Sequence, residues 1–107
     1  MPKYLLKANY TLEGNKGLMK GGGGTARRTA VRELVEGAGG KLEAFYYAFG
    51  ETDLYAIIEL PDNVAAAALS LVVNAAGGAE VGATVLFSAE EMDEAVKRQV
   101  KYRPPGQ

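Results

Sequence analysis

The sequence predicts a single α+β domain with four strands and two main helices in the order β-α-β-β-α-β, followed by a short third helix. Apolar residues alternate at the start of the chain, two later segments space them as helices do, and glycine or proline clusters separate the segments. With 107 residues, 48% of them hydrophobic and 23% charged, the chain is long enough for one packed core and unlike a disordered chain. We therefore assign residues 1–107 to one domain.

The first strand and the first helix are separated by many glycines. Lys3–Tyr10 alternates between a more polar and a more apolar face, as a strand does. Residues 11–24 contain six glycines and end in four consecutive ones, which predicts a long flexible loop with at most a helical turn near Asn15–Lys20. Thr25 is expected to cap the first helix, which ends at the glycines of 37–40.

A hairpin and a second helix follow. Aromatic and β-branched residues predict strands over Lys41–Phe49 and Leu54–Leu60, joined by a tight turn at 50–53. Val64–Ala76 is alanine-rich with little polar surface, so we expect both the sheet and another element to cover this helix. Glu80–Ser88 is the expected fourth strand.

The last segment is expected to contain a short helix and an arm. Ser88 and Glu91 have the spacing of a capping box, which predicts that a third helix starts there. Residues 101–107 contain two prolines and are expected to be a non-helical arm. The order of elements is that of a ferredoxin-like fold, a four-stranded antiparallel sheet with both main helices on one face.

The other face of the sheet is the expected contact with further copies of the chain. The second and third predicted strands are apolar or aromatic on both faces, and soluble monomers seldom expose large apolar patches. We therefore expect a homodimer or higher homo-oligomer formed through the face that carries Phe45, Tyr47, Tyr55 and Ile57. A register shift of one residue would exchange this set for its neighbours.

Several classes of function are not expected from the composition. A formal net charge of −1 provides no broad positive field for nucleic acid. The chain contains neither cysteine nor histidine, so we expect no metal site and no cofactor held by these residues. No signal-like or membrane-spanning stretch is evident, so we expect a cytoplasmic protein without a membrane partner.

Segments along nearly the whole chain match a known family. They include Lys3-Tyr4-Leu5, Gly40-Lys41-Leu42-Glu43, Leu60-Pro61-Asp62, and Gly50 with Asp53. In these segments the chain resembles the GYD domain family of small bacterial proteins, although Thr52 stands where the name-giving aromatic residue would be. The resemblance implies an arrangement of the dimeric α+β barrel type, with two ferredoxin-like domains packed sheet against sheet, and no agreed substrate, cofactor or catalytic residue.

Arg27 and Arg28 are the sharpest candidates for ligand binding. They follow four glycines at the start of a predicted helix, where backbone N–H groups carry partial positive charge and a guanidinium is able to bind a carboxylate or phosphate. The alternative is that the segment binds no ligand and is a flexible loop followed by two solvated arginines. The segment is neither a Walker A loop nor a dinucleotide-binding fingerprint.

Other polar and aromatic residues complete the candidate ligand set, which is Thr25, Arg27, Arg28, Tyr46, Asp53 and Asn74. Asp53 is a possible ligand-orienting group or base, but it equally fits a turn that bonds its own backbone. Asn74 either points into a cavity, caps a carbonyl or contacts another subunit. Tyrosines, Tyr46 among them, either line a pocket or pack in the core and interface.

Three functions are compatible with these residues. The first is an oligomeric domain that binds a small anionic or aromatic metabolite between the sheet and the glycine-rich loop. The second is a cofactor-free monooxygenase or isomerase, which would need tyrosine, Asp53 or lysine to move protons. The third is a purely structural or assembly role. The residues do not decide whether the chain is an enzyme.

Overall fold

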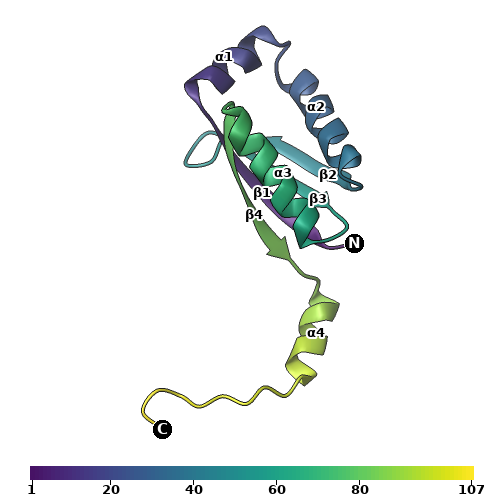
Figure 1. The fold of residues 1–107 in the computed structure, drawn as a ribbon, viewed down its shortest axis with the longest axis vertical. Helices are drawn as coiled ribbons and strands as arrows, with labels where there is room; N and C mark the ends of the chain where they lie inside the picture. Colours follow the sequence, from purple (N-terminus) through teal and green to yellow (C-terminus); the bar gives the residue numbers. More distant parts are fainter.

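All 107 residues are described in a computed structural model. The elements are β1 (Lys3–Tyr10), α1 (Leu12–Lys20), α2 (Gly24–Gly37), β2 (Lys41–Tyr47), β3 (Leu54–Glu59), α3 (Asn63–Ala76), β4 (Ala79–Leu86) and α4 (Ala89–Lys97). The strands form one antiparallel sheet in the order β2-β3-β1-β4. Helices α2 and α3 lie side by side over one face of the sheet, with α1 at one end and α4 projecting from the other (Figure 1). The predicted α+β class and element order are confirmed.

The core lies between the sheet and helices α2 and α3. Alternate residues of the two central strands supply most of it, with Val35 from α2 and Leu69 from α3 packed against them. The Tyr4 hydroxyl, on a side chain that is almost fully buried, donates a hydrogen bond of 2.6 Å to Asn63 Oδ1. Buried phenols normally find such a partner, and this one ties the start of α3 to β1.

One of the two predicted helix caps is confirmed and the other is wrong. Ser88 and Glu91 form the predicted capping box at α4, and Asp62 accepts from the Ala65 N–H to cap α3. Thr25, in contrast, lies inside the first turn of α2, whose N-cap is Gly23 with no side-chain hydrogen bond. The φ of Gly23 is +82°, a conformation that glycine adopts at little cost, so the helix begins earlier than a search for a threonine cap suggests.

The predicted flexible loop over residues 11–24 is mostly helix α1. Thr11 caps this helix by accepting from the Gly14 N–H at 3.1 Å. The Thr11 hydroxyl also donates to the Gly77 carbonyl at 2.8 Å, which fixes the start of α1 against the turn between α3 and β4. Only residues 21–23 connect α1 to α2. The segment therefore forms a capped helix despite its high glycine content.

The connection between β2 and β3 sets which residues share a face of the sheet. It contains the six residues Ala48–Asp53 and is closed by a hydrogen bond of 2.8 Å from the Ala48 N–H to the Asp53 carbonyl. It is longer than the predicted tight turn. Tyr47 pairs with Leu54 across it. Because six is an even number, odd-numbered residues share a face with even-numbered residues of β3 over Ala44–Tyr47, the part of β2 that follows a register shift between Leu42 and Ala44.

The predicted interface residues therefore do not form one surface. Phe45 pairs with Ala56 of the core, so Phe45 and Tyr47 lie on the face that the helices cover. Their rings pack edge to face with centroids 5.3 Å apart. Tyr55 and Ile57 lie on the open face. The prediction that these four residues share a face is wrong. It placed odd-numbered residues of both strands on the same face, whereas Phe45 and Tyr47 pair with even-numbered residues of β3.

The end of the chain leaves the body of the domain. Helix α4 and the segment after it extend away from the sheet (Figure 1), and every residue from Phe87 to Gln107 is exposed. The arm predicted over residues 101–107 thus begins earlier, directly after β4. No helix has both the length and the apolar character needed to cross a membrane.

Candidate functional site

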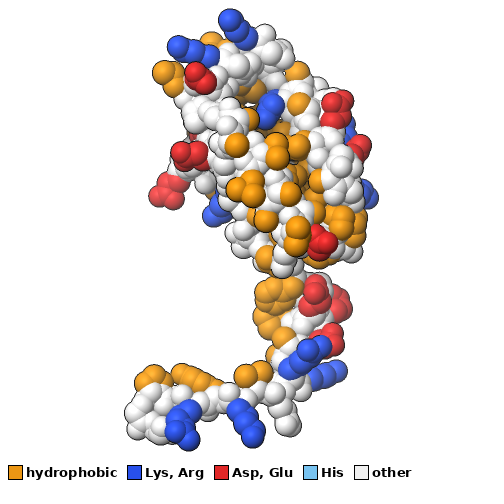
Figure 2. Space-filling view, in the orientation of Figure 1, with side chains coloured by type: hydrophobic (Ala, Val, Ile, Leu, Met, Phe, Trp, Pro, Cys, Tyr) orange, Lys and Arg blue, Asp and Glu red, His pale blue; other side chains and the backbone are white.

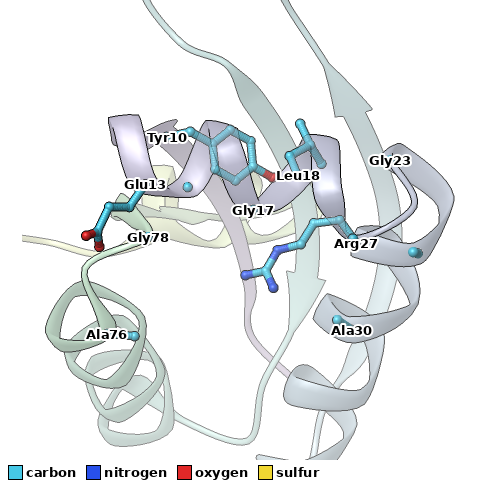
Figure 3. Close-up of a pocket in the computed structure, with 12 residues that line it drawn as sticks. Tyr10, Glu13, Gly17, Leu18, Gly23, Arg27, Ala30, Ala76 and Gly78 are labelled. Carbon is cyan, nitrogen blue, oxygen red and sulfur yellow. The ribbon is translucent and has the colours of Figure 1, made fainter.

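The candidate site is a cavity between α1, the start of α2 and the end of α3. Its volume is about 480 Å³, within the range of small-molecule pockets. Tyr10 at the end of β1 and Arg27 on α2 both project into it (Figure 3). Glycine and alanine residues form much of the remaining wall. The site therefore combines one cation, one phenol and a largely uncharged lining.

One side of α1 lines the cavity largely with glycine. Gly14, Gly17 and Gly21 line the cavity together with Leu18. Residues spaced by three, four and seven positions lie on the same face of a helix. A Cβ atom at Gly17 would meet nothing within 4 Å, so the space beside this residue is open. The glycines that suggested a loop instead give α1 a flat face over a cavity.

Gly14 fixes the distance between α1 and the turn after α3. A Cβ atom at this position would overlap the Gly78 carbonyl oxygen, so only glycine allows this approach. The Thr11 N–H donates to the same carbonyl at 3.2 Å. These contacts fix the position of α1, which forms one wall of the cavity.

Arg27 supplies the positive charge of the site. Its guanidinium lies near the middle of the cavity, whereas Glu13 stands at the rim and points away from it (Figure 3). Neither ion pair of the structure includes Arg27. The start of α2, which has no side-chain cap, borders the same space at Gly23. Unbonded N–H groups at a helix start add positive potential, so the cavity is suited to an anion.

An apolar recess adjoins the cavity. A smaller recess of about 40 Å³ lies between α2, α3 and the sheet, and 12 of its 13 lining residues are hydrophobic. It shares Tyr10 and Arg27 with the larger cavity. A ligand with an anionic group beside Arg27 would thus direct its apolar part towards this recess.

Tyr47 lies behind the start of α2. Its hydroxyl donates to the Gly24 carbonyl at 3.2 Å, and its ring lies so close to Gly24 that a Cβ there would come within 2.9 Å of the ring. Burial of the hydroxyl, followed by the neighbouring Tyr10, raises the pKa of Tyr47 to about 12. Although 41% of the residue is exposed, the contact with Gly24 is at its polar end. Tyr47 is therefore a neutral phenol near pH 7 and a poor base.

The raised pKa of Tyr47 predicts a loss of stability in alkali. Because the folded state holds this proton more tightly than the unfolded chain, its contribution is complete below pH 10 and is lost as the pH rises towards about 12. The pKa of Lys3, raised chiefly by its hydrogen bond with Glu43, acts in the same direction. Urea unfolding across this range should show a shallower decline for Tyr47→Phe than for the parent, with Tyr46→Phe as the control. Equal declines in all three proteins would refute the assignment.

Five of the six predicted ligand residues lie outside the cavity, among them Thr25, Arg28 and Tyr46. Arg28 and Tyr46 line a separate hollow of about 300 Å³ beside β2, on another side of α2 from Arg27. Thr25 is exposed, and its carbonyl accepts from the Thr29 hydroxyl at 3.2 Å. The structure therefore separates the adjacent arginines, and only Arg27 of the predicted set lines the candidate cavity.

Asp53 and Asn74 bond to the backbone of neighbouring strands. Asp53 Oδ2 accepts from the Tyr10 N–H at 2.9 Å, which joins the loop before β3 to the end of β1. Asn74 accepts from the Val81 N–H at 2.8 Å and donates to the Val81 carbonyl at 3.2 Å, which joins α3 to β4. Both side chains hold the elements around the cavity rather than line it.

The match to a family model extends over most of the chain. The model of the GYD domain matches residues 4–96. The chain belongs to the GYD domain family. Comparisons with curated proteins and with solved structures each find no match. In this GYD domain, the matched residues include all of the cavity lining and α4 as far as Val96.

Sequence reasoning missed the role of α1 in this GYD domain. The available signals were Thr11 placed three residues before Gly14, as a helix cap is, and the spacing of Gly14, Gly17 and Gly21 on one helical face. Tyr10, which the same reasoning grouped with the other tyrosines, is the phenol that reaches the cavity. No group of three or more acidic side chains lies close enough together to hold a metal ion.

Proposed function

We propose that this GYD domain binds a small amphipathic anion, such as an aromatic carboxylate or phosphate ester, in the cavity beneath α1. The observation that carries the proposal is the position of Arg27, which projects without an ion-pair partner into a space that adjoins an apolar recess. A guanidinium binds carboxylate or phosphate through paired hydrogen bonds. The apolar part of the ligand would lie towards Tyr10 and the recess.

Binding is favoured over proton-transfer catalysis by the groups near the cavity. The phenol of Tyr47 has a raised pKa and so holds its proton too firmly to act as a base near neutrality. Asp53 uses a carboxylate oxygen to accept from the backbone of Tyr10. Arg27 is a fixed cation that recognises charge without moving a proton.

The proposal predicts that Arg27 and Arg28 contribute unequally to binding. The probes are benzoate and phenyl phosphate, with neutral benzamide as a control of similar shape. Arg27→Gln should weaken binding of both anions by roughly 10- to 100-fold, because it removes a charge-assisted interaction worth about 1.5–3 kcal/mol. Calorimetric titration measures the affinities.

Arg28→Gln is the matched control, since Arg28 is the next residue but lies beside another hollow. It should leave the affinity for benzoate nearly unchanged. Equal losses in the two variants, or equal binding of benzamide and benzoate by the parent protein, would contradict a site centred on Arg27.

We also propose that the domain self-associates through the open face of its sheet. Leu5, Tyr55 and Ile57 lie on this face, at positions that do not contribute to the core. Lys3 and Lys7 flank them on β1, and Lys3 pairs with Glu43 at 2.9 Å. Sedimentation of Ile57→Asp should show weaker association than the parent. Unchanged sedimentation would rule out this face.

A further inference from the structure

The outer surface of α3 is unusually apolar for a helix in contact with water. The helix contains no charged residue over Asn63–Ala76, yet only Ala66 and Leu69 of it are buried. Val64 is 77% exposed and Leu71 is 71% exposed. Hydrophobic side chains gather over the middle of the body, where α3 lies in front (Figure 2). Helices with apolar residues all round are normally covered on every side.

A groove between α2 and α3 continues this apolar surface. It has a volume of about 490 Å³, and Leu34 on α2 and Val72 on α3 are among its lining residues. Glu33 is the charged residue of its lining. The groove and the outer face of α3 together form an apolar receiving surface on the body.

The arm, residues 87–107, carries a matching apolar stripe without a partner in its own chain. Met92 and Val96 are one helical turn apart on α4, and Val100 is a further apolar residue beyond the end of the helix. Val96 is 77% exposed and Val100 is 82% exposed. On the opposite side of α4 lie acidic and basic residues such as Glu90, Glu94 and Lys97.

A short connection joins the arm to the body. Only Phe87 and Ser88 join β4 to α4. Ser88 and Glu91 exchange two hydrogen bonds, of 2.9 and 3.1 Å, that lock the first turn of the helix. The arm points away from its own α3 (Figure 1), so its apolar stripe is exposed in the single chain.

The exposed area has the size of a stable interface. The chain exposes 7727 Å², whereas a compact monomer of 11.3 kDa exposes about 5,700 Å². The radius of gyration is 17.0 Å, against about 13 Å for a compact chain of this length. The surplus of about 2,000 Å² exceeds the roughly 800 Å² that each partner of a standard interface buries.

We propose that the arm packs on the receiving surface of a second copy of this chain, which returns its own arm in the same way. The apolar stripe of α4 would lie on α3 and the groove beside it, with the charged side of α4 facing water. This exchange uses a surface other than the ligand cavity and other than the open face of the sheet. The arm of the second copy would also be the additional element, besides the sheet, that we expect to cover the apolar helix α3.

Disulfide trapping between two variants tests the exchange, because the chain has no native cysteine. Leu71→Cys and Val96→Cys are prepared separately, checked for native circular dichroism, mixed and mildly oxidised. The mixture should form a disulfide-linked heterodimer, identified by mass spectrometry. Glu94→Cys mixed with Leu71→Cys should give about tenfold less, since residue 94 faces away and disulfides require closely placed Cβ atoms.

Two outcomes would overturn the proposal. One is equal trapping with Val96→Cys and with Glu94→Cys, or none with either, which would mean that the arm does not dock on α3 of another copy. The other is a disulfide that forms within single chains of a Leu71→Cys/Val96→Cys double variant but not between the mixed single variants. That result would place the arm on its own body.

Discussion

Replacing Gly14 by alanine is expected to lower the free energy of unfolding by about 2–3 kcal/mol, the upper part of the range of about 1–3 kcal/mol for forcing extra carbon atoms into a packed contact. A Cβ at this position would overlap the Gly78 carbonyl, which belongs to a backbone turn that has little room to move. For a domain of this size the melting temperature should fall by roughly 10 °C or more. Urea unfolding followed by circular dichroism measures the change.

Gly17→Ala is the matched control for this loss, because it makes the same substitution one turn later in α1. A Cβ at Gly17 meets nothing within 4 Å, and alanine is preferred over glycine inside a helix by up to about 1 kcal/mol. The control should therefore be as stable as the parent or slightly more so. Changes of the same sign in the two variants would show that α1 is not held against Gly78.

Replacing Gly17 by leucine is expected to abolish binding of benzoate and phenyl phosphate while leaving the domain folded. The leucine side chain would enter the open space beside Gly17, which lies on the wall of the cavity that contains Arg27. We expect an affinity loss of at least about 100-fold, because the leucine side chain and the ligand would compete for the same volume. Both could be accommodated only if α1 moved away from the cavity. Calorimetry measures binding, and urea unfolding checks stability.

Gly37→Leu is the control for this variant. Gly37 is also a helical glycine with nothing within 4 Å of a Cβ, but it lies beside the groove between α2 and α3 instead of the cavity. It should bind both probes as the parent does. If Gly17→Leu retained full affinity, the ligand could not occupy the space under α1.

Local patterns in the sequence predicted the body of the fold well. The alternation of Lys3–Tyr10 and the capping box at Ser88 each depend on near neighbours in the chain, so they were readable without tertiary information. The pairing of Phe45 with Ala56 requires an even-numbered connection, and both the predicted four-residue turn and the observed six-residue connection provide one. The error lay in placing odd-numbered residues of both strands on one face, because an even connection pairs odd-numbered residues of the first strand with even-numbered residues of the second.

The cavity was harder to predict because glycines form much of its wall. Six glycines in fourteen residues normally indicate a loop, and the hydrogen bond from the Thr11 hydroxyl to Gly77 joins segments 66 positions apart. Arg27 and Arg28 are identical in type and adjacent, so composition offered no means of separating them. Only the placement of α1 over α2 distinguishes the arginine inside the cavity from the one outside.

A backbone amide NMR titration with benzoate tests the central claim most directly, because it reports where on the chain a ligand binds. The predicted result is a saturable set of shifts at Gly17, Arg27 and Gly78, which line the cavity from three elements, with none of comparable size for benzamide. Shifts confined to surface lysines, or centred on Arg28 and Tyr46 beside β2, would contradict a binding site beneath α1.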